Sequence, residues 1–530
     1  MRDRPTVYQS IFARGTRMVI ERNLIDILPR NGAGATGALK SPFDGVSPPP
    51  PPVLASATRG GIQLGGGCEH VTVAGNVIRG GIWNGITLGS LIIAGGGTDD
   101  VPDKPNSLDL CDPCRPLDTT DDPANGDVEI RSAGHLYDIT IRDNTIEDMG
   151  ANGIGVVRFF NVGKRPIFIT VHGLHILGNG IRRCVRREVS QPSAAMQWLV
   201  GYGGVSLACV TDLRINDNEI EHCGVSHLEP ICGVFAIVVQ NLELDRNRIV
   251  DNGPRKGEEP ASAAKAGTRG GVWIWVVGPN ATPRTVDGLK LQRWDGIPAA
   301  AIRDNLIVVP LGRTITMLGL GHMSVLRNRL ATSGTTGRDL ELLATTALIV
   351  NVGLSNEWTL GLIFALIFGF GLPPGRRCEL GLALGLFNPT NARPWPPLSV
   401  AWPTGKLLVA ENQISCDTVD QPRGFALSSL FVAGLDDVGF LDNQSEVDSQ
   451  HFVFLFNLIA AAGSVRVNDN RFSETWLRTI LSASTFGLMN ITAHNESTHC
   501  MRAIGAQRVF RDNLHFVTMF CPDFCGRKNL

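Results

Sequence analysis

The sequence of 530 residues has few aromatic side chains and almost no net charge. Aromatic residues make up 6%, and the formal net charge is −2, from 48 lysines and arginines against 50 aspartates and glutamates. Proteins that bind nucleic acid carry a basic surface, so this balance predicts no nucleic-acid partner. The first residues, MRDRPTVYQSIFARG, are charged and contain no apolar stretch, so no signal peptide is visible and the compartment stays undetermined.

The sequence also lacks an apolar run long enough to cross a membrane. Its most apolar stretch, LGLIFALIFGFGL from Leu360 to Leu372, has 13 residues, whereas a membrane-spanning helix needs about 20. No transmembrane segment is therefore predicted. We interpret residues 357–390 as an apolar hairpin of two buried strands. The alternative is a hairpin that contacts a membrane or a partner protein.

Familiar catalytic and metal-binding motifs are missing as well. The chain contains neither a Gly-x-Ser-x-Gly elbow nor a phosphate-binding glycine loop followed by Lys and Ser or Thr. Two histidine pairs, His172 with His175 and His494 with His499, have spacings that direct the two rings of a pair to opposite faces of a strand. We therefore predict no cofactor and no metal site.

Twelve cysteines leave the redox state open. Cys500 lies beside an apolar stretch, where a buried cysteine acts as a small hydrophobe. Two close pairs, Cys111 with Cys114 and Cys521 with Cys525, are each compatible with a local disulfide or with half of a zinc site. The sequence does not choose between these two states.

What the chain does contain is an eight-residue phrase that recurs from end to end. Its pattern is apolar, any, apolar, any, any, Asn, any, apolar, as in ITIRDNTI from Ile139 to Ile146. The copy at Val438 has Ser445 in place of the last apolar residue, and looser copies surround Asn495 and Asn513. A unit that repeats in this way indicates a solenoid, and a composition with 60 glycines suits many short strands.

The phrase predicts a bent unit of two short strands. Its first half alternates apolar and polar residues, which is the period of a strand with one buried face. Asn tolerates the left-handed backbone region well, so we expect it at a sharp corner between strands. Stacked corner asparagines can hydrogen-bond through their side-chain amides. The predicted structural ladder consists of Asn23, Asn76, Asn144, Asn179, Asn218, Asn247, Asn305, Asn328, Asn412, Asn443 and Asn470.

These repeats resemble those of the right-handed parallel β-helix proteins of the pectate-lyase-like superfamily. The resemblance covers the chain from Met18 to about Phe516. It implies an all-β fold, a single right-handed parallel β-helix solenoid with coils from about residue 16 to 516. The hand of the coil follows from the resemblance alone. Enzymes of that superfamily cleave uronate polymers with clustered acidic residues, or with calcium-binding acidic residues and a basic residue.

Insertions interrupt the predicted solenoid. Residues 40–60 contain a polyproline segment, which cannot donate to the hydrogen-bond ladder of a sheet, and residues 95–126 and 251–270 are loop-like. The phrase already runs at Met18, which leaves little room for a polar cap over the first coil. We therefore favour the interpretation that the sequence is a piece of a longer chain over a cap supplied by another chain, and the sequence does not tell whether Met1 is the natural start.

The strand stack that we follow beyond the asparagine corners carries few titratable side chains on its outer face. Alternation along GVFAIVVQ and GGVWIWVVG directs Phe235, Trp273 and Trp275 outward. An exposed apolar patch of this kind would contact a partner protein, a second copy of the chain or a sugar ring. The alternative is that an insertion packs over these side chains.

We therefore expect a non-catalytic structural or adhesive module that binds a partner protein or a glycan through its outer strand face. The alternative is a carbohydrate-active enzyme, a polysaccharide lyase or a glycoside hydrolase, that acts on an acidic polysaccharide. That alternative follows from the fold resemblance alone. Its acid and base would lie in the loops, at residues such as Asp99, Asp100 and Asp122.

Overall fold

The computed structural model describes a large part of the chain. The described residues are 9–27, 59–94, 129–159, 169–187, 200–225, 231–254, 269–278, 284–286, 289–291, 298–333, 346–351, 406–417, 430–434, 436–448, 455–474, 481–509 and 513–520. The predicted insertion 95–126, which contains the candidate residues Asp99, Asp100 and Asp122, and the predicted apolar hairpin 357–390 lie outside them. So do both close cysteine pairs and most of 40–60 and 251–270.

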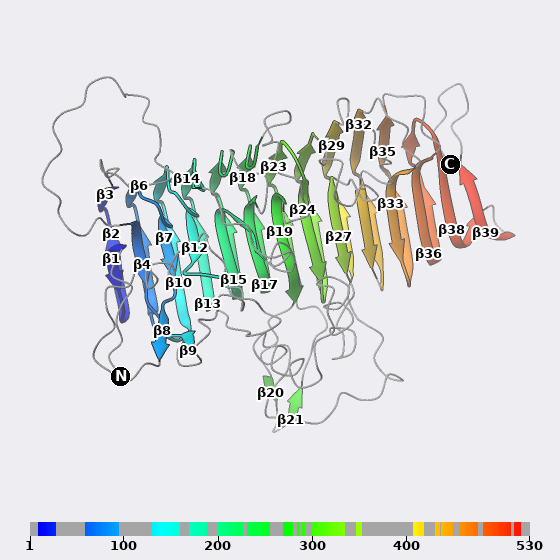
Figure 1. The fold of residues 1–530 in the computed structure, drawn as a ribbon. Helices are drawn as coiled ribbons and strands as arrows, with labels where there is room; N and C mark the ends of the chain where they lie inside the picture. Colours follow the sequence, from blue (N-terminus) through cyan, green and yellow to red (C-terminus); the bar gives the residue numbers. More distant parts are fainter. Residues whose placement is uncertain are drawn as a thin grey trace, which may run out of the picture.

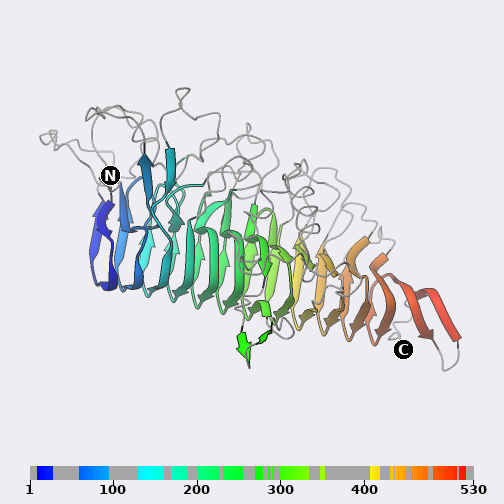
Figure 2. The same ribbon diagram turned by 90° about the horizontal axis from the view of Figure 1, so that it is seen from below.

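The described residues form strands and no helix, and the strands stack into one elongated solenoid, with the first strands at one end and the last at the other (Figures 1 and 2). Successive coils pair in parallel and in register. Ile139, for example, lies between Val71 of the preceding coil and Leu174 of the following one. The predicted all-β parallel solenoid is confirmed.

Each coil contributes strands to three faces, which we call A, B and C. Face A precedes the asparagine corner and holds β2 (Thr16–Glu21), β5 (Glu69–Ala74), β10 (Leu136–Arg142), β13 (Thr170–Leu177), β15 (Tyr202–Asn216), β17 (Ile231–Asp245), β22 (Pro298–Arg303), β25 (His322–Leu326), β28 (Leu407–Ala410), β31 (Val438–Leu441), β34 (Ser464–Asn468) and β36 (Leu481–Ala493).

Face B follows the corner and consists of short strands. It holds β3 (Leu24–Ile27), β6 (Val77–Gly80), β11 (Thr145–Glu147), β14 (Gly180–Arg182), β16 (Glu219–Glu221), β18 (Arg248–Val250), β23 (Leu306–Val309), β26 (Arg329–Thr332), β29 (Gln413–Asp417), β32 (Gln444–Asp448), β35 (Arg471–Glu474) and β37 (Glu496–Ser497). These strands form one sheet of 12.

Face C completes each coil. It holds β1 (Gln9–Ala13), β4 (Gly60–Leu64), β7 (Ile86–Leu88), β12 (Ile154–Val156), β19 (Arg269–Gly278), β24 (Arg313–Gly319), β27 (Ala347–Asn351), β30 (Leu430–Gly434), β33 (Leu455–Ala461) and β38 (Cys500–Val509). Strands β15, β17 and β36 run from face C into face A and join the two faces into one sheet.

Three strand pairs depart from the parallel pattern. Strands β8 (Leu91–Ala94) and β9 (Glu129–Ser132) form one antiparallel pair, and β20 (Arg284–Val286) and β21 (Leu289–Leu291) form another. Strand β39 (Asn513–Phe520) runs antiparallel to β38. The looser phrase at Asn513 therefore begins an antiparallel strand, and the expected coil there does not form.

The apolar positions of the phrase line the interior of the coils. Ile139, Ile141 and Ile146 of ITIRDNTI have no exposed surface. Burial of each such side chain stabilises the fold by about 1.5–3 kcal/mol. Alternation thus places one residue of every two in a continuous core along the solenoid.

The corner asparagines form one continuous hydrogen-bond ladder. The side-chain Nδ2 of each asparagine donates to the Oδ1 of the asparagine in the next coil, at 2.8 to 3.1 Å. The backbone N–H of each donates to the same Oδ1. The structure places all eleven predicted asparagines in this ladder, and Asn495 continues it at the carboxyl end.

The turn itself is made one residue earlier than we expected. The residue before each ladder asparagine is left-handed, with φ between 51° and 62°, whereas the asparagines are not. These residues are Arg22, Gly75, Asp143, Gly178, Asp217, Arg246, Asp304, Arg327, Glu411, Asp442, Asp469 and His494. The asparagine is thus selected for its side-chain amide, since its backbone does not use the left-handed region that Asn tolerates.

A second column of left-handed residues interrupts face A. Successive coils place His70, Asp138, Gly173, Asp212 and Asn241 at φ of 50° to 73°. The column breaks the strand alternation between His172 and His175, so both rings point outward, where each is half-buried. The predicted placement of these two histidines on opposite faces is therefore wrong.

The unexpected Ser445 belongs to a chain of polar contacts inside the last coils. Its hydroxyl donates to Asn457 Oδ1 at 3.0 Å, and Asn457 Nδ2 donates to the Ser482 carbonyl at 2.9 Å. The Ser482 hydroxyl donates to Glu474 Oε2 at 2.9 Å, and the same oxygen lies 3.3 Å from His499 Nδ1. Ser445 thus replaces an apolar residue without leaving its hydroxyl unpaired.

Candidate functional site

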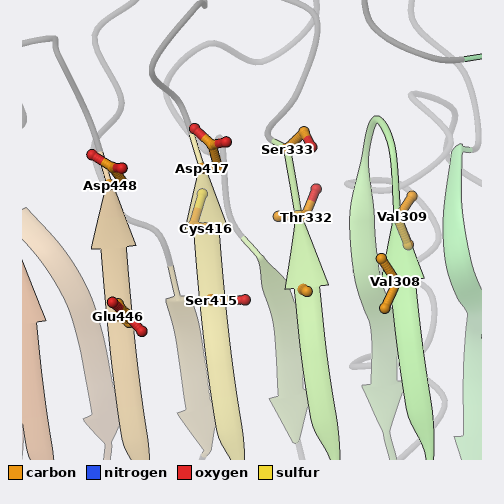
Figure 3. Close-up of a pocket in the computed structure, with 10 residues that line it drawn as sticks. Val308, Val309, Thr332, Ser333, Ser415, Cys416, Asp417, Glu446 and Asp448 are labelled. Atoms are coloured by element: carbon orange, nitrogen blue, oxygen red, sulfur yellow. The ribbon is translucent and has the colours of Figure 1, made fainter.

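A groove opens on face B where β26, β29 and β32 end. Its volume is about 200 Å³. Figure 3 shows Asp417 and Asp448 at the same end of neighbouring strands, with Ser415 and Glu446 further back on those strands. We call this site the carboxylate groove; it is lined by Val308, Val309, Ala331, Thr332, Ser333, Ser415, Cys416, Asp417, Glu446 and Asp448.

The ladder explains why these carboxylates meet. Asp417 and Asp448 each follow a ladder asparagine by five residues, and they are register partners on β29 and β32. Ser415 and Glu446 are likewise paired, each three residues after its asparagine. Because the asparagines are aligned by their hydrogen bonds, equal offsets bring equivalent residues to the same height on adjacent strands, about 4.8 Å apart.

The groove combines strong acceptors with an apolar wall. The lining residues that the structure describes include three carboxylates and no Lys, Arg or His. Val308, Val309 and Ala331 form the apolar side. Burial raises the pKa of the Cys416 thiol to about 11, so this thiol stays protonated near neutral pH.

The structure does not indicate a metal centre in the part of the chain that it describes. No group of three or more His, Cys, Asp or Glu side chains there is arranged to hold an ion.

The aromatic residues predicted to bind a ligand are buried. Phe235, Trp273 and Trp275 are 0%, 4% and 8% exposed. The Phe235 ring packs edge-on against Phe159, and the two indoles pack edge-to-face at 5.2 Å between centroids. These side chains do not form the exposed patch on which the binding prediction depends, and we assign them to packing beneath the outer surface of face C.

One cysteine also differs from expectation. Cys500, which we expected to be a buried small hydrophobe, is disulfide-bonded. Cys209 is a buried thiol outside any disulfide, and burial raises its pKa to about 12. The described cysteines thus include both oxidised and reduced forms.

The groove was not predicted because the candidate residues Phe235, Trp273 and Trp275 lie on face C, whereas the carboxylates lie on the short strands of face B. The available signal was the repeated offset, since N-x-x-x-x-D occurs at both Asn412 and Asn443.

Comparisons of the chain with protein-family models, with curated proteins and with solved structures find no match. Within the residues that the structure describes, no helix is long and apolar enough to span a bilayer. Functional inference therefore depends on the groove and on the outer faces of the solenoid.

Proposed function

We propose that this protein is a glycan-binding β-helix module and that the carboxylate groove holds the sugar. The observation that carries the proposal is the combination of Asp417, Glu446 and Asp448 with hydroxyl groups and an apolar wall in one cavity. Sugar hydroxyls donate to carboxylate oxygens, and such charge-assisted hydrogen bonds are roughly twice as strong as neutral ones. The C–H faces of a sugar ring pack against apolar side chains.

The carboxylates of the groove accept hydrogen bonds from the hydroxyl or amino groups of a glycan, so we expect a neutral or amino-bearing sugar there.

A second candidate function is glycoside hydrolysis, and a specific observation favours it. Asp417 and Asp448 are register partners on adjacent strands, which lie about 4.8 Å apart. Retaining glycosidases place an acid and a nucleophile with about 5–5.5 Å between their carboxyl groups. In this alternative one aspartate protonates the leaving oxygen and the other attacks the anomeric carbon.

Membership of the pectate-lyase-like superfamily, with the right-handed coil that it implies, is part of the same proposal. The support for it is the recurring phrase and the asparagine ladder at one corner of each coil. The ladder supports the fold assignment and gives no information on the ligand.

The first experiment measures binding and cleavage together. Affinity electrophoresis against neutral, amino-bearing and acidic polysaccharides is combined with an assay for new reducing ends. Asp417→Asn and Asp448→Asn should each weaken binding at least about tenfold, the loss expected for one charge-assisted hydrogen bond. Asp442→Asn is the matched control, because Asp442 lies at a left-handed corner outside the groove, where Asn is tolerated.

The outcomes separate the two candidates. Binding without new reducing ends, lost in the groove variants and kept in the control, supports the binding module. New reducing ends that disappear in both groove variants support the hydrolase. Binding that is unchanged in both groove variants removes the groove from the proposal.

A further inference from the structure

A cluster of aromatic rings lies on the outer surface of face A, away from the carboxylate groove. Tyr137 on β10 stacks on His172 of β13, with 5.0 Å between ring centroids and 16° between the ring planes. His135 packs edge-on against His172, with 5.5 Å between centroids. We call these three residues the ring cluster. Tyr137 and Asp417 are six coils apart along the asparagine ladder, roughly 29 Å along the solenoid.

The rings are held in place by their neighbours. His172 Nδ1 lies 3.2 Å from the Thr211 hydroxyl of the next coil. Burial, and then the nearby His135, lowers the pKa of His172, so the stacked ring is uncharged near neutral pH. A ring fixed before binding loses little conformational entropy when a ligand packs on it.

One side of Tyr137 is open to a ligand. Tyr137 is 41% exposed. The chain has only three tyrosines, and one of the others, Tyr202, is completely buried. His172 covers one side of its ring, and on the opposite side its register partner is Glu69 of β5, whose side chain is 48% exposed. A ligand stacked on the open side of Tyr137 therefore lies above β5.

The carboxylates of Glu69 and Asp138 and the imidazole of His70 lie next to the open side of Tyr137. His70 lies between two carboxylates, with Nε2 at 3.5 Å from Glu69 Oε1 and Nδ1 at 3.1 Å from Asp138 Oδ2. All three side chains are about half-exposed or more. The left-handed φ of His70 and Asp138 turns both residues to the outside, beside the open face of Tyr137.

We infer that the open face of Tyr137 is a second sugar-binding site, which stacks one pyranose of a neutral glycan while Glu69 and Asp138 accept hydrogen bonds from its hydroxyls. A fixed aromatic face matches the C–H face of the ring, and exposed carboxylates match its hydroxyls. The same carboxylates disfavour a uronate. Tyr137, Glu69 and Asp138 are not among the residues that line the carboxylate groove, so the two sites can be tested separately.

The test uses the small number of tyrosines. The full chain is labelled with 3-fluorotyrosine, and the Tyr137 resonance is assigned by its loss in Tyr137→Phe. Neutral hexasaccharides of glucose, mannose and xylose are then titrated by ¹⁹F NMR and by calorimetry. We expect at least one of them to shift the Tyr137 resonance while the Tyr202 resonance stays in place.

Variants then separate the two sites. Tyr137→Ala should weaken binding of that hexasaccharide about tenfold, the loss of one ring contact, whereas Tyr137→Phe should keep it within about threefold. Asp417→Asn should leave the Tyr137 shift unchanged. A Tyr137 resonance that no hexasaccharide moves, or equal affinities for the native chain and Tyr137→Ala, overturns the inference. If Asp417→Asn abolishes binding and Tyr137→Ala does not, the groove proposal stands and this inference fails.

Discussion

Removal of one asparagine from the middle of the ladder should destabilise the solenoid far more than removal of the first one. Asn305 is 2% exposed, and its Oδ1 accepts hydrogen bonds from the backbone N–H and the side-chain Nδ2 of Asn247. Its own Nδ2 donates to the Leu244 carbonyl and to Asn328 Oδ1, both at 2.9 Å. Asn305→Ala deletes all four contacts and leaves their partners buried.

The magnitude follows from the number of bonds. At about 1 kcal/mol of net stabilisation for each, four hydrogen bonds give a loss of about 4 kcal/mol in the free energy of unfolding. Asn23 is half-buried and donates two side-chain bonds, to Asn76 Oδ1 and to the Glu21 carbonyl. Asn23→Ala should therefore lower the free energy of unfolding by about 1–2 kcal/mol.

The assay is urea unfolding followed by far-ultraviolet circular dichroism, with the slope of the transition compared among variants so that changes in cooperativity are recognised. The expected order of midpoints is native, Asn23→Ala and Asn305→Ala. A loss below about 1 kcal/mol for Asn305→Ala, or equal losses at Asn305 and Asn23, would refute the view that the ladder stabilises the coils.

Three further predictions concern other described residues. Burial raises the pKa of Glu474, so its contribution to stability is present at low pH and is lost as the pH rises through that raised pKa. The urea midpoint of the native chain should therefore fall more steeply than that of Glu474→Gln as the pH rises above the ordinary glutamate pKa of about 4.5, and parallel curves would contradict this. Glu411 has a φ of 57°, so Glu411→Val should lower the free energy of unfolding by about 1–2 kcal/mol relative to Glu411→Gly, as measured by urea unfolding. Equal stability of the two variants would show that the left-handed turn is not strained. Because the pKa of the buried Cys209 is raised to about 12, iodoacetamide at mildly alkaline pH should leave it unmodified in the folded chain and alkylate it in urea, as read by mass spectrometry.

The periodic part of the fold was predictable because it is encoded locally. ITIRDNTI carries both the period of a half-buried strand and the amide that joins neighbouring coils, so Ile139, Ile141 and Asn144 were assigned their positions without the structure. The backbone detail was not predictable in the same way. Many residue types occupy the left-handed position before the asparagine, among them Arg22, Asp143 and Gly178. No single residue type therefore identifies this position in the sequence.

The candidate sites required contacts between coils. Asp417 and Asp448 are 31 residues apart along the chain, as are their ladder partners Asn412 and Asn443, and only the parallel register makes the two aspartates neighbours. The equal offset from the ladder was present in the sequence. It could not be interpreted until the face that carries each strand was known.

From its sequence alone the chain specifies that it coils, which asparagines align the coils and which side chains fill the interior, because those properties depend on spacing within about ten residues. The tertiary structure assigns the outer surface. It buries Trp273 and Trp275, turns His172 and His175 to the same side, and brings Asp417 beside Asp448. The physical reason is that exposure and proximity on a solenoid are set by the packing of neighbouring coils, whose separation along the chain varies with every insertion.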